Sequence, residues 1–248
     1  MACLSQRIRP TRFRDNPLMS LAEKYDQFYS QGSDSRRVVI PLRGHPRNRI
    51  EAAVSVTGGG NSILDIGCGD GSLLFQFRER FSELIGLELS STRLAQARAT
   101  LSDARFRPIL GSAEHMPQID TNSIDRIVSA DTIEHIPDVY AAASEMYRIL
   151  RPGGTLVVNT PNIAYVKRRV LLLLGRFPAT SQPNEGLGSD ILFDGGHFHY
   201  FTFRSLTLLL QKAGFHIIQR TAYGKFGRLH ALWPSLTSVG VQLVATKD

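Results

Sequence analysis

Glycines and an acid near residue 70 have the types and spacing of a site for a nucleoside-bearing cofactor. Gly67, Gly69 and Gly71 follow an apolar run over residues 63–66, and Glu88 ends a second apolar run. Glycine has no Cβ atom, so the backbone can turn sharply and approach a ligand. The helix expected after the loop offers free N–H groups and a positive dipole end to an anionic group. The block therefore predicts a strand, a binding loop and a helix, with Glu88 placed to accept hydrogen bonds from ribose hydroxyls.

The spacing of the glycines separates two kinds of cofactor. Dinucleotide loops usually read G-x-G-x-x-G, whereas residues 67–71 read G-x-G-x-G, and Asp65 stands two positions before the first glycine. This variant resembles motif I of the class I S-adenosylmethionine-dependent methyltransferases. In that family the loop wraps the methionine part of the cofactor, and an acid after the second strand holds the ribose. The resemblance implies S-adenosylmethionine as the cofactor, bound by Asp65, Gly67, Cys68, Gly69, Glu88 and Leu89.

A third segment, residues 111–117, resembles the part of these enzymes that lines the adenine. The resemblance implies that Ser112, Ala113 and Glu114 lie against the base, where a backbone N–H meets a ring nitrogen. Many relatives carry aspartate at the position of Ser112. The acceptor for the exocyclic amine is therefore either Glu114 or the Ser112 hydroxyl.

Residues 131–137 read D-T-I-E-H-I-P and resemble the family's segment near the transferred methyl group. The resemblance adds Asp131 to the cofactor site. His135 is a candidate general base or a wall of the acceptor pocket, with local packing as the alternative. Glu134 and His135 are adjacent, and without further ligands no metal site is predicted.

The segment H-F-H-Y-F-T over residues 197–202 supplies the preferred base, His197. It resembles a segment of bacterial methyltransferases that act on small metabolites, quinones or sugars, and of the methionine-biosynthesis protein W type. There the segment follows a lid and faces the acceptor. Residues 175–196, rich in Gly, Pro, Ser and Asn, are the expected lid, mobile without ligand and closing over the acceptor.

The elements that position these residues alternate between strand and helix. This alternation, with the resemblance, predicts an α/β, Rossmann-like sheet of seven mostly parallel strands covered by helices on both faces. A helical N-terminal cap and an insertion after strand five complete the expected fold. Strands are expected at residues 62–66, 83–88, 105–110, 124–129, 155–159, 215–221 and 238–246, with a turn at 151–154. Ligands of such sheets bind beyond the carboxyl ends of the strands.

The expected organisation is a basic, disordered tail over residues 1–19 and one methyltransferase domain over residues 20–248. Residues 163–201 form its substrate-side insertion. The apolar run 170–174 is expected to be a buried helix face, with contact to a membrane as the alternative. No window of eighteen apolar residues exists, so no transmembrane helix is predicted.

The net charge bears on nucleic-acid binding, and the cysteine content bears on the cellular compartment. The formal net charge of +7 permits nucleic-acid binding. No basic stripe interleaved with aromatics supports it, so no nucleic acid is expected. The two cysteines, Cys3 and Cys68, suggest no disulfide framework and suit the reducing cytoplasm.

The sequence thus predicts a methyltransferase, with an oxygen of a small-molecule acceptor preferred because histidines suit a hydroxyl near neutral pH. Its oligomeric state is left open. One rival is a nicotinamide-dependent oxidoreductase, disfavoured by the loop spacing and by the lack of an evident hydride-site Tyr-Lys or Cys-His pair. The other rival is a non-catalytic cofactor-binding partner protein, since a fold does not guarantee chemistry.

Overall fold

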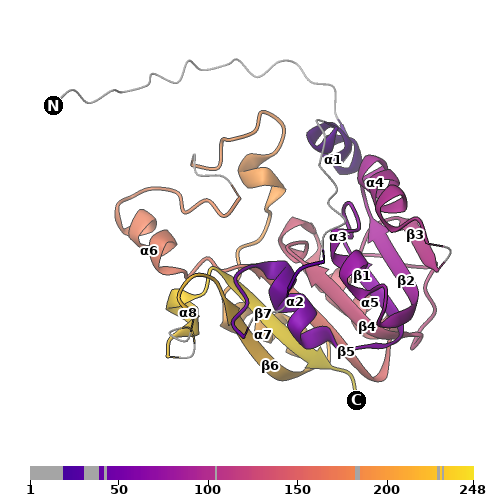
Figure 1. The fold of residues 1–248 in the computed structure, drawn as a ribbon. Coiled ribbons are helices and arrows are strands. Elements are labelled where there is room, and N and C mark those ends of the chain that lie inside the picture. The colour runs from indigo at the N-terminus through magenta and orange to yellow at the C-terminus, as the bar shows by residue number, and fades with distance from the viewer. Residues whose placement is uncertain are drawn as a thin grey trace.

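The computed structural model describes residues 19–30, 39–41, 44–103, 105–181, 185–227, 230 and 232–248. Within these ranges one seven-stranded sheet has the order β3-β2-β1-β4-β5-β7-β6 (Figure 1). Strands β1 to β5 are parallel, and β7 runs antiparallel between β5 and β6. The strands are β1 Gly60–Ile66, β2 Phe81–Glu88, β3 Phe106–Leu110, β4 Ile124–Ala130, β5 Leu150–Pro161, β6 His216–Tyr223 and β7 Gly240–Thr246. The predicted fold class is confirmed.

Helices cover both faces of the sheet because successive apolar side chains of each central strand point in opposite directions. Ile63 and Leu84 pack in one cluster with residues of three helices, whereas Leu64 and Ile85 pack in the other. The first face carries α2 (Arg49–Thr57), α3 (Ser72–Phe77) and α4 (Ser91–Leu101). The second carries α5 (Val139–Ile149) and α7 (Phe203–Lys212).

The expected N-terminal cap is α1 (Leu21–Tyr29), which begins with a capping box between Ser20 and Glu23. Asp26 fixes this helix to the start of α4, where its carboxylate accepts hydrogen bonds from Ser90 Oγ, Ser91 Oγ and the Thr92 N–H. An acid at a helix N-terminus is favoured by the helix dipole. The contact holds α1 above the carboxyl edge of the sheet.

The insertion after β5 contains α6 (Val166–Leu173) and the short turn η2 (Phe193–Gly196), and α8 (Pro234–Thr237) precedes β7. The expectation that residues 170–174 form a buried helix face is wrong. Helix α6 has no buried residue, and Leu173 is 86% exposed, because the helix lies outside the layers that cover the sheet (Figure 1). Over the described residues, the helices are too short and too polar to cross a membrane.

The turn predicted at residues 151–154 lies inside β5 as a strand irregularity. Ile124 pairs with Leu150, but Arg126 pairs with Thr155, so β5 carries extra residues against β4. The basic tail predicted over residues 1–19 lies outside the described residues except for Met19.

Candidate functional site

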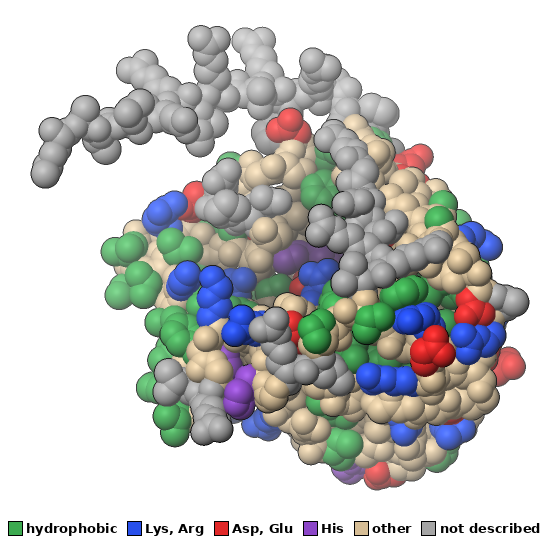
Figure 2. Space-filling model, viewed as in Figure 1, with side chains coloured by type: hydrophobic (Ala, Val, Ile, Leu, Met, Phe, Trp, Pro, Cys, Tyr) green, Lys and Arg blue, Asp and Glu red, His purple; other side chains and the backbone are tan. Residues whose placement is uncertain are grey.

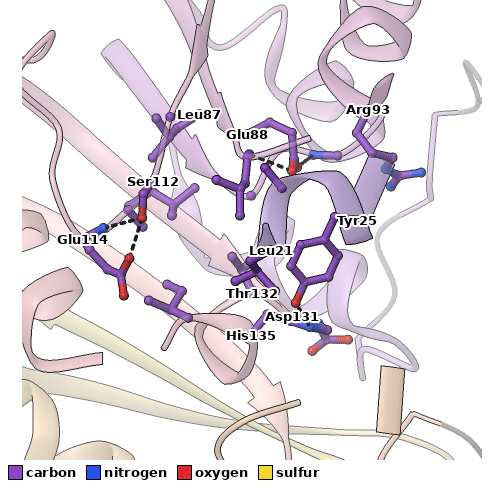
Figure 3. A pocket seen from close by; sticks show the side chains of 18 of the residues that line it. Leu21, Tyr25, Leu87, Glu88, Arg93, Ser112, Glu114, Asp131, Thr132 and His135 are labelled. Atoms are coloured by element: carbon purple, nitrogen blue, oxygen red, sulfur yellow. Dashed lines mark hydrogen bonds between the residues drawn. The ribbon is translucent and has the colours of Figure 1, made fainter. Parts of the chain in front are cut away.

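A cavity of about 490 Å³ lies beyond the carboxyl ends of β1, β2, β3 and β4. The loop or residue that ends each strand contributes to its wall: Gly67 after β1, Glu88 of β2, Ser112 after β3 and Asp131 after β4. Tyr25 of α1 closes it from the other side (Figure 3). The cavity is therefore at the sheet edge where open α/β folds bind their ligands.

The glycine loop forms a tight cradle. Gly67 has φ +74°, and a Cβ atom there would lie 2.4 Å from the Thr132 side chain. Gly69 has φ +54°, and its Cβ atom would meet the Arg93 guanidinium at 2.5 Å. Both glycines line the cavity, so the backbone approaches a ligand directly. This geometry fits a cofactor whose amino-acid part lies against the loop.

Glu88 is held rigidly by three backbone N–H groups. Its Oε2 accepts from Gly69 at 2.9 Å, and its Oε1 accepts from Leu89 at 2.9 Å and Ser90 at 3.0 Å. A carboxylate has roughly four lone-pair sites. One site on Oε2 therefore remains for a ligand hydroxyl, and a second ribose bond would displace a backbone bond.

Most of the predicted cofactor residues come together at the cavity. The lining includes Gly67, Gly69, Glu88, Leu89, Ser112, Ala113, Glu114 and Asp131. Two others, Asp65 and Cys68, are buried beneath the loop and do not line it. Burial, and then the nearby charge of Glu88, raise the pKa of Asp65 well above its usual value.

Ser112 and Glu114 form one unit at the end expected to hold adenine. The Ser112 hydroxyl donates to Glu114 Oε2 at 2.8 Å and accepts from the Glu114 N–H at 3.2 Å. Glu114 Oε1 accepts from the Asp138 N–H at 2.7 Å. The two side chains predicted as candidate acceptors for the adenine amine therefore form one hydrogen-bonded pair.

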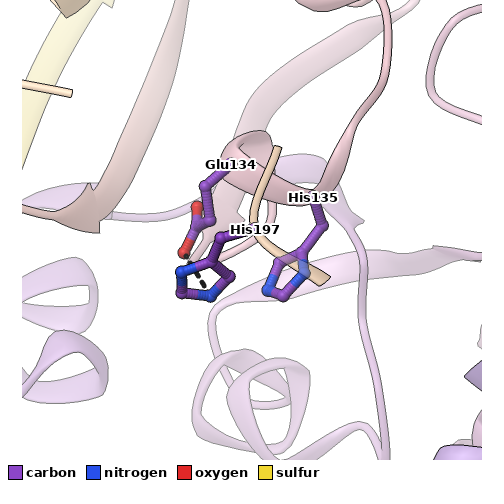
Figure 4. Close-up of side chains that lie close together, drawn as sticks. All are labelled: Glu134, His135 and His197. Carbon is purple, nitrogen blue, oxygen red and sulfur yellow. Dashed lines mark ion pairs between the residues drawn. The ribbon is translucent and has the colours of Figure 1, made fainter. Parts of the chain in front are cut away.

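Beside the cavity, Glu134, His135 and His197 lie close together (Figure 4). Glu134 and His135 belong to η1 (Ile133–His135), and His197 directly follows η2. The carbonyl of Glu134 accepts from the N–H groups of Phe198 and His199 at 2.8 and 3.2 Å, which ties the two segments together. The rings of His135 and His197 meet edge to face with centroids 4.5 Å apart. The structure thus joins the two predicted catalytic histidines.

The hydrogen-bond network assigns the tautomer of His197. Thr180 Oγ1 donates its single proton to Asp194 Oδ2 at 2.8 Å. It must therefore accept from His197 Nδ1, which lies 2.5 Å away. In the neutral ring the lone pair is then on Nε2, which lies 4.0 Å from Glu134 Oε1.

Burial favours the neutral forms of all three side chains. It lowers the pKa of His135 to about 4, with help from His197, and it lowers the pKa of His197 despite the nearby Asp194. Burial and then Asp131 raise the pKa of Glu134 well above its usual value. Glu134 Oε2 accepts from Thr160 Oγ1 at 2.9 Å, but the buried Oε1 has no hydrogen-bond partner.

The N-terminal cap and the insertion meet at His135. Tyr25 Oη lies 3.1 Å from His135 Nδ1 and donates to the Gly196 carbonyl at 3.4 Å. A Cβ atom at Gly196 would lie 2.7 Å from Tyr25 Oη. Only glycine therefore permits this close approach of η2 to α1.

Sequence reasoning missed several side chains of the site. Arg49 forms an ion pair with Asp131 at 3.0 Å, and Arg93 stacks over Tyr29 with its guanidinium carbon 4.6 Å from the ring centre. Asp194 accepts hydrogen bonds from residues 180, 181 and 200 and orders the end of the insertion. None belongs to a recognisable motif, and the glycines after Asp194 predict only a turn.

Residues 64–158 match the methyltransferase domain family. A protein of Mycolicibacterium smegmatis named as a probable S-adenosylmethionine-dependent methyltransferase is 30% identical over 64% of this chain and 53% of its own length. A ubiquinone biosynthesis O-methyltransferase of Alkalilimnicola ehrlichii is 28% identical over 56% of this chain and 58% of its own length. The chain thus spans about half the length of these curated relatives. An S-adenosylmethionine-dependent methyltransferase structure from Mesorhizobium loti superposes with a TM-score of 0.60 at 20% identity, over 79% of this chain and 95% of that one.

Proposed function

The chain carries a class I S-adenosylmethionine-dependent methyltransferase domain, and from this premise we propose that it methylates an oxygen atom of a small-molecule acceptor. This is the family that the glycine loop predicted, and S-adenosylmethionine is its cofactor. The observation that carries the proposal is that the cofactor cavity is continuous with a pair of partly buried histidines, because His135 lines the cavity and contacts His197.

The cofactor half of the cavity positions the donor. When bound, S-adenosylmethionine supplies an electrophilic methyl group, whose transfer leaves the carbon–sulfur electron pair on sulfur. Gly67 and Gly69 admit the amino-acid part, Glu88 orients the ribose, and Ser112 with Glu114 orients the base. Holding two reactants in line is worth roughly 7–11 kcal/mol of the barrier.

The histidines prepare the acceptor. Both imidazoles are neutral near pH 7, because burial lowers their pKa values. His197 Nε2 presents a lone pair, so it is the preferred group to take the hydroxyl proton, with His135 as the alternative. A positioned base contributes roughly 10²–10⁴-fold to the rate.

We propose that the insertion, residues 163–201, is the acceptor-binding part of a domain over residues 20–248. Its residues 175–196, of which 182–184 lie outside the described residues, are the proposed lid, and His197 directly follows them. The lid would close over the acceptor and exclude water.

The leucines of α6 supply a second contact surface at the insertion. Leu172, Leu173 and Leu174 are 65%, 86% and 68% exposed, and Lys167 and Arg169 beside them are also exposed. Hydrophobic side chains with Lys or Arg side chains near them gather at the place of α6 (Figure 2). Apolar side chains flanked by cations complement an anionic lipid surface. We propose weak contact of α6 with such a surface from the cytoplasmic side. Sedimentation with phosphatidylserine vesicles tests it: binding that persists in Leu172→Ser/Leu173→Ser would contradict it.

Binding and turnover measurements test the proposed function. Purified protein should bind S-adenosylmethionine and not NADH, and it should transfer labelled methyl groups from the cofactor into a metabolite extract. Binding of NADH alone would favour the oxidoreductase rival. Binding of S-adenosylmethionine without transfer into any extract would favour a non-catalytic partner protein.

A further inference from the structure

The cluster of Glu134, His135 and His197 contains a buried oxygen atom without a hydrogen-bond partner. One ligand atom from each of these residues lies within 4.8 Å of the other two. Glu134 is 1% exposed, and its Oε1 has no hydrogen-bond partner. A buried polar oxygen without a hydrogen-bond partner is costly. We propose that these three side chains bind one divalent transition-metal ion.

The separation between the ligand atoms of His197 and Glu134 fits a single ion after a small contraction. Two ligands bound at about 2.1 Å in tetrahedral geometry are about 3.4 Å apart. His197 Nε2 and Glu134 Oε1 lie 4.0 Å apart, too far for a hydrogen bond and slightly wider than this value. His197 Nε2 presents a lone pair to the space between them, since Nδ1 carries the ring proton. Glu134 Oε1 presents one when its carboxyl group is ionised, so an ion that binds here displaces the carboxyl proton. A cation satisfies both lone pairs at once.

The surroundings of His197 have the form of an outer ligand shell. Metal-binding histidines usually donate their second N–H to an oxygen that fixes the ring, and loss of such a partner typically weakens metal binding 10–100-fold. Here Nδ1 donates to Thr180 Oγ1, which donates in turn to the buried Asp194. The second oxygen of Glu134 is likewise held by Thr160. His197 and Glu134 are therefore oriented in advance.

The ligand chemistry selects the class of metal. Two imidazoles and one carboxylate suit Zn²⁺ and its transition-metal neighbours, whereas Mg²⁺ and Ca²⁺ prefer oxygen ligands throughout. Three protein ligands leave at least one position open. Because His135 also lines the cavity, this position is available to a ligand that enters there.

This inference rests on the proposed function and refines it. An ion at this place would bind the acceptor through oxygen and lower the pKa of its hydroxyl. The lone pair of His197 would then be used on the ion, and the acceptor proton would pass to solvent. The acceptor class is narrowed to molecules that offer an oxygen ligand beside the methylated position.

Metal binding to the full chain, measured without any methyl acceptor, tests the inference. After treatment with a chelator and its removal, titration calorimetry should show one Zn²⁺ per chain, with Mg²⁺ at least 100-fold weaker. Glu134→Gln and His197→Ala should each weaken Zn²⁺ binding at least tenfold. His216→Ala is the matched control, because this exposed histidine pairs with Asp248 at 2.9 Å, and it should leave the affinity unchanged.

A second measurement needs no variant. X-ray absorption of the zinc-loaded wild-type protein should show two imidazole ligands. Absence of stoichiometric Zn²⁺ binding, or equal affinity in all three variants, would overturn the inference. Retained S-adenosylmethionine affinity in the same variants shows that they are folded. Zinc binding without cofactor binding would refute the proposed function and leave the metal site standing.

Discussion

On the cofactor side of the cavity, defined by Gly67, Gly69, Glu88, Ser112 and Glu114, contacts join residues that are close in the chain. Gly69 and Glu88, which share a hydrogen bond, are 19 positions apart, and Ser112 and Glu114 are two apart.

On the acceptor side, defined by Glu134, His135 and His197, the contacts are long-range. Tyr25 meets His135 over 110 positions and Gly196 over 171. The cofactor side is formed by the ends of neighbouring strands and the short loops that follow them. The acceptor side exists only after the cap and the insertion have docked on the sheet.

The two sides also differ in how their polar groups are satisfied. Glu88 has three backbone donors. Glu134 is fully buried, and one of its oxygens has no partner. Where the polar atoms of a site already have hydrogen-bond partners, a ligand forms additional hydrogen bonds with them. Where a buried polar atom has no partner, a proton or a ligand must supply one. The difference predicts that substitutions on the two sides affect different steps.

The largest expected effect is on turnover. His197→Ala should lower kcat roughly 10²–10⁴-fold, because the variant lacks the group proposed to take up the hydroxyl proton of the acceptor. Affinity for S-adenosylmethionine, measured by calorimetry, should stay within twofold, since His197 does not line the cofactor cavity. Turnover at the parent rate on the true acceptor would remove His197 from the mechanism, and His135→Ala would be tested next.

The opposite pattern is expected for Gly69→Val. A side chain here enters the cradle, and overpacking costs about 1–3 kcal/mol, to which the φ of +54° adds strain. Cofactor affinity should fall about 100-fold while circular dichroism shows a folded protein. Gly153→Val is the matched control, because Gly153 has φ +72° with open space around its position. Unchanged affinity in a folded Gly69→Val protein would refute the placement of the cofactor.

A smaller loss of cofactor affinity is expected for Glu88→Ala. One lone-pair site on Glu88 Oε2 remains for a ligand hydroxyl, and a hydrogen bond to a charged group is worth roughly 1.5–3 kcal/mol. The affinity for S-adenosylmethionine should therefore fall at least tenfold. Glu83→Ala is a fair control, since Glu83 of the same strand pairs with Arg107 at the surface. An affinity within twofold of the parent would show that the ribose lies elsewhere.

The smallest expected effect is that of Thr180→Val, which tests whether orientation alone matters on the acceptor side. Valine keeps the shape but cannot accept from His197 Nδ1, so the ring loses its fixed tautomer. We expect kcat to fall about tenfold, with the KM for S-adenosylmethionine unchanged and partial rescue in Thr180→Ser. An effect confined to thermal stability would mean that Thr180 only supports the insertion.

The alternation of short apolar runs with helical segments predicted the α/β class, because it depends on local periodicity. The seven-stranded fold and the cofactor loop were predicted from this alternation together with the family resemblance, which rests on glycines at fixed positions. The parallel strands β1 to β4 place their carboxyl ends on one edge, where Glu88 and Ser112, predicted from the family resemblance, line the cavity. Asp65 belongs to the same motif, but its burial below the loop depends on packing of both faces of β1.

Only the tertiary structure decided what surrounds the two histidines. The sequence places Glu134 beside His135, but it cannot show that the N–H groups of Phe198 and His199 donate to the Glu134 carbonyl and bring His197 against Glu134. Nor could it show that α6 stays outside the core, because an apolar run has the same pattern whether or not a partner covers it. Local rules fix a loop between neighbouring strands, whereas burial and the pairing of distant side chains are settled only when the whole chain has packed.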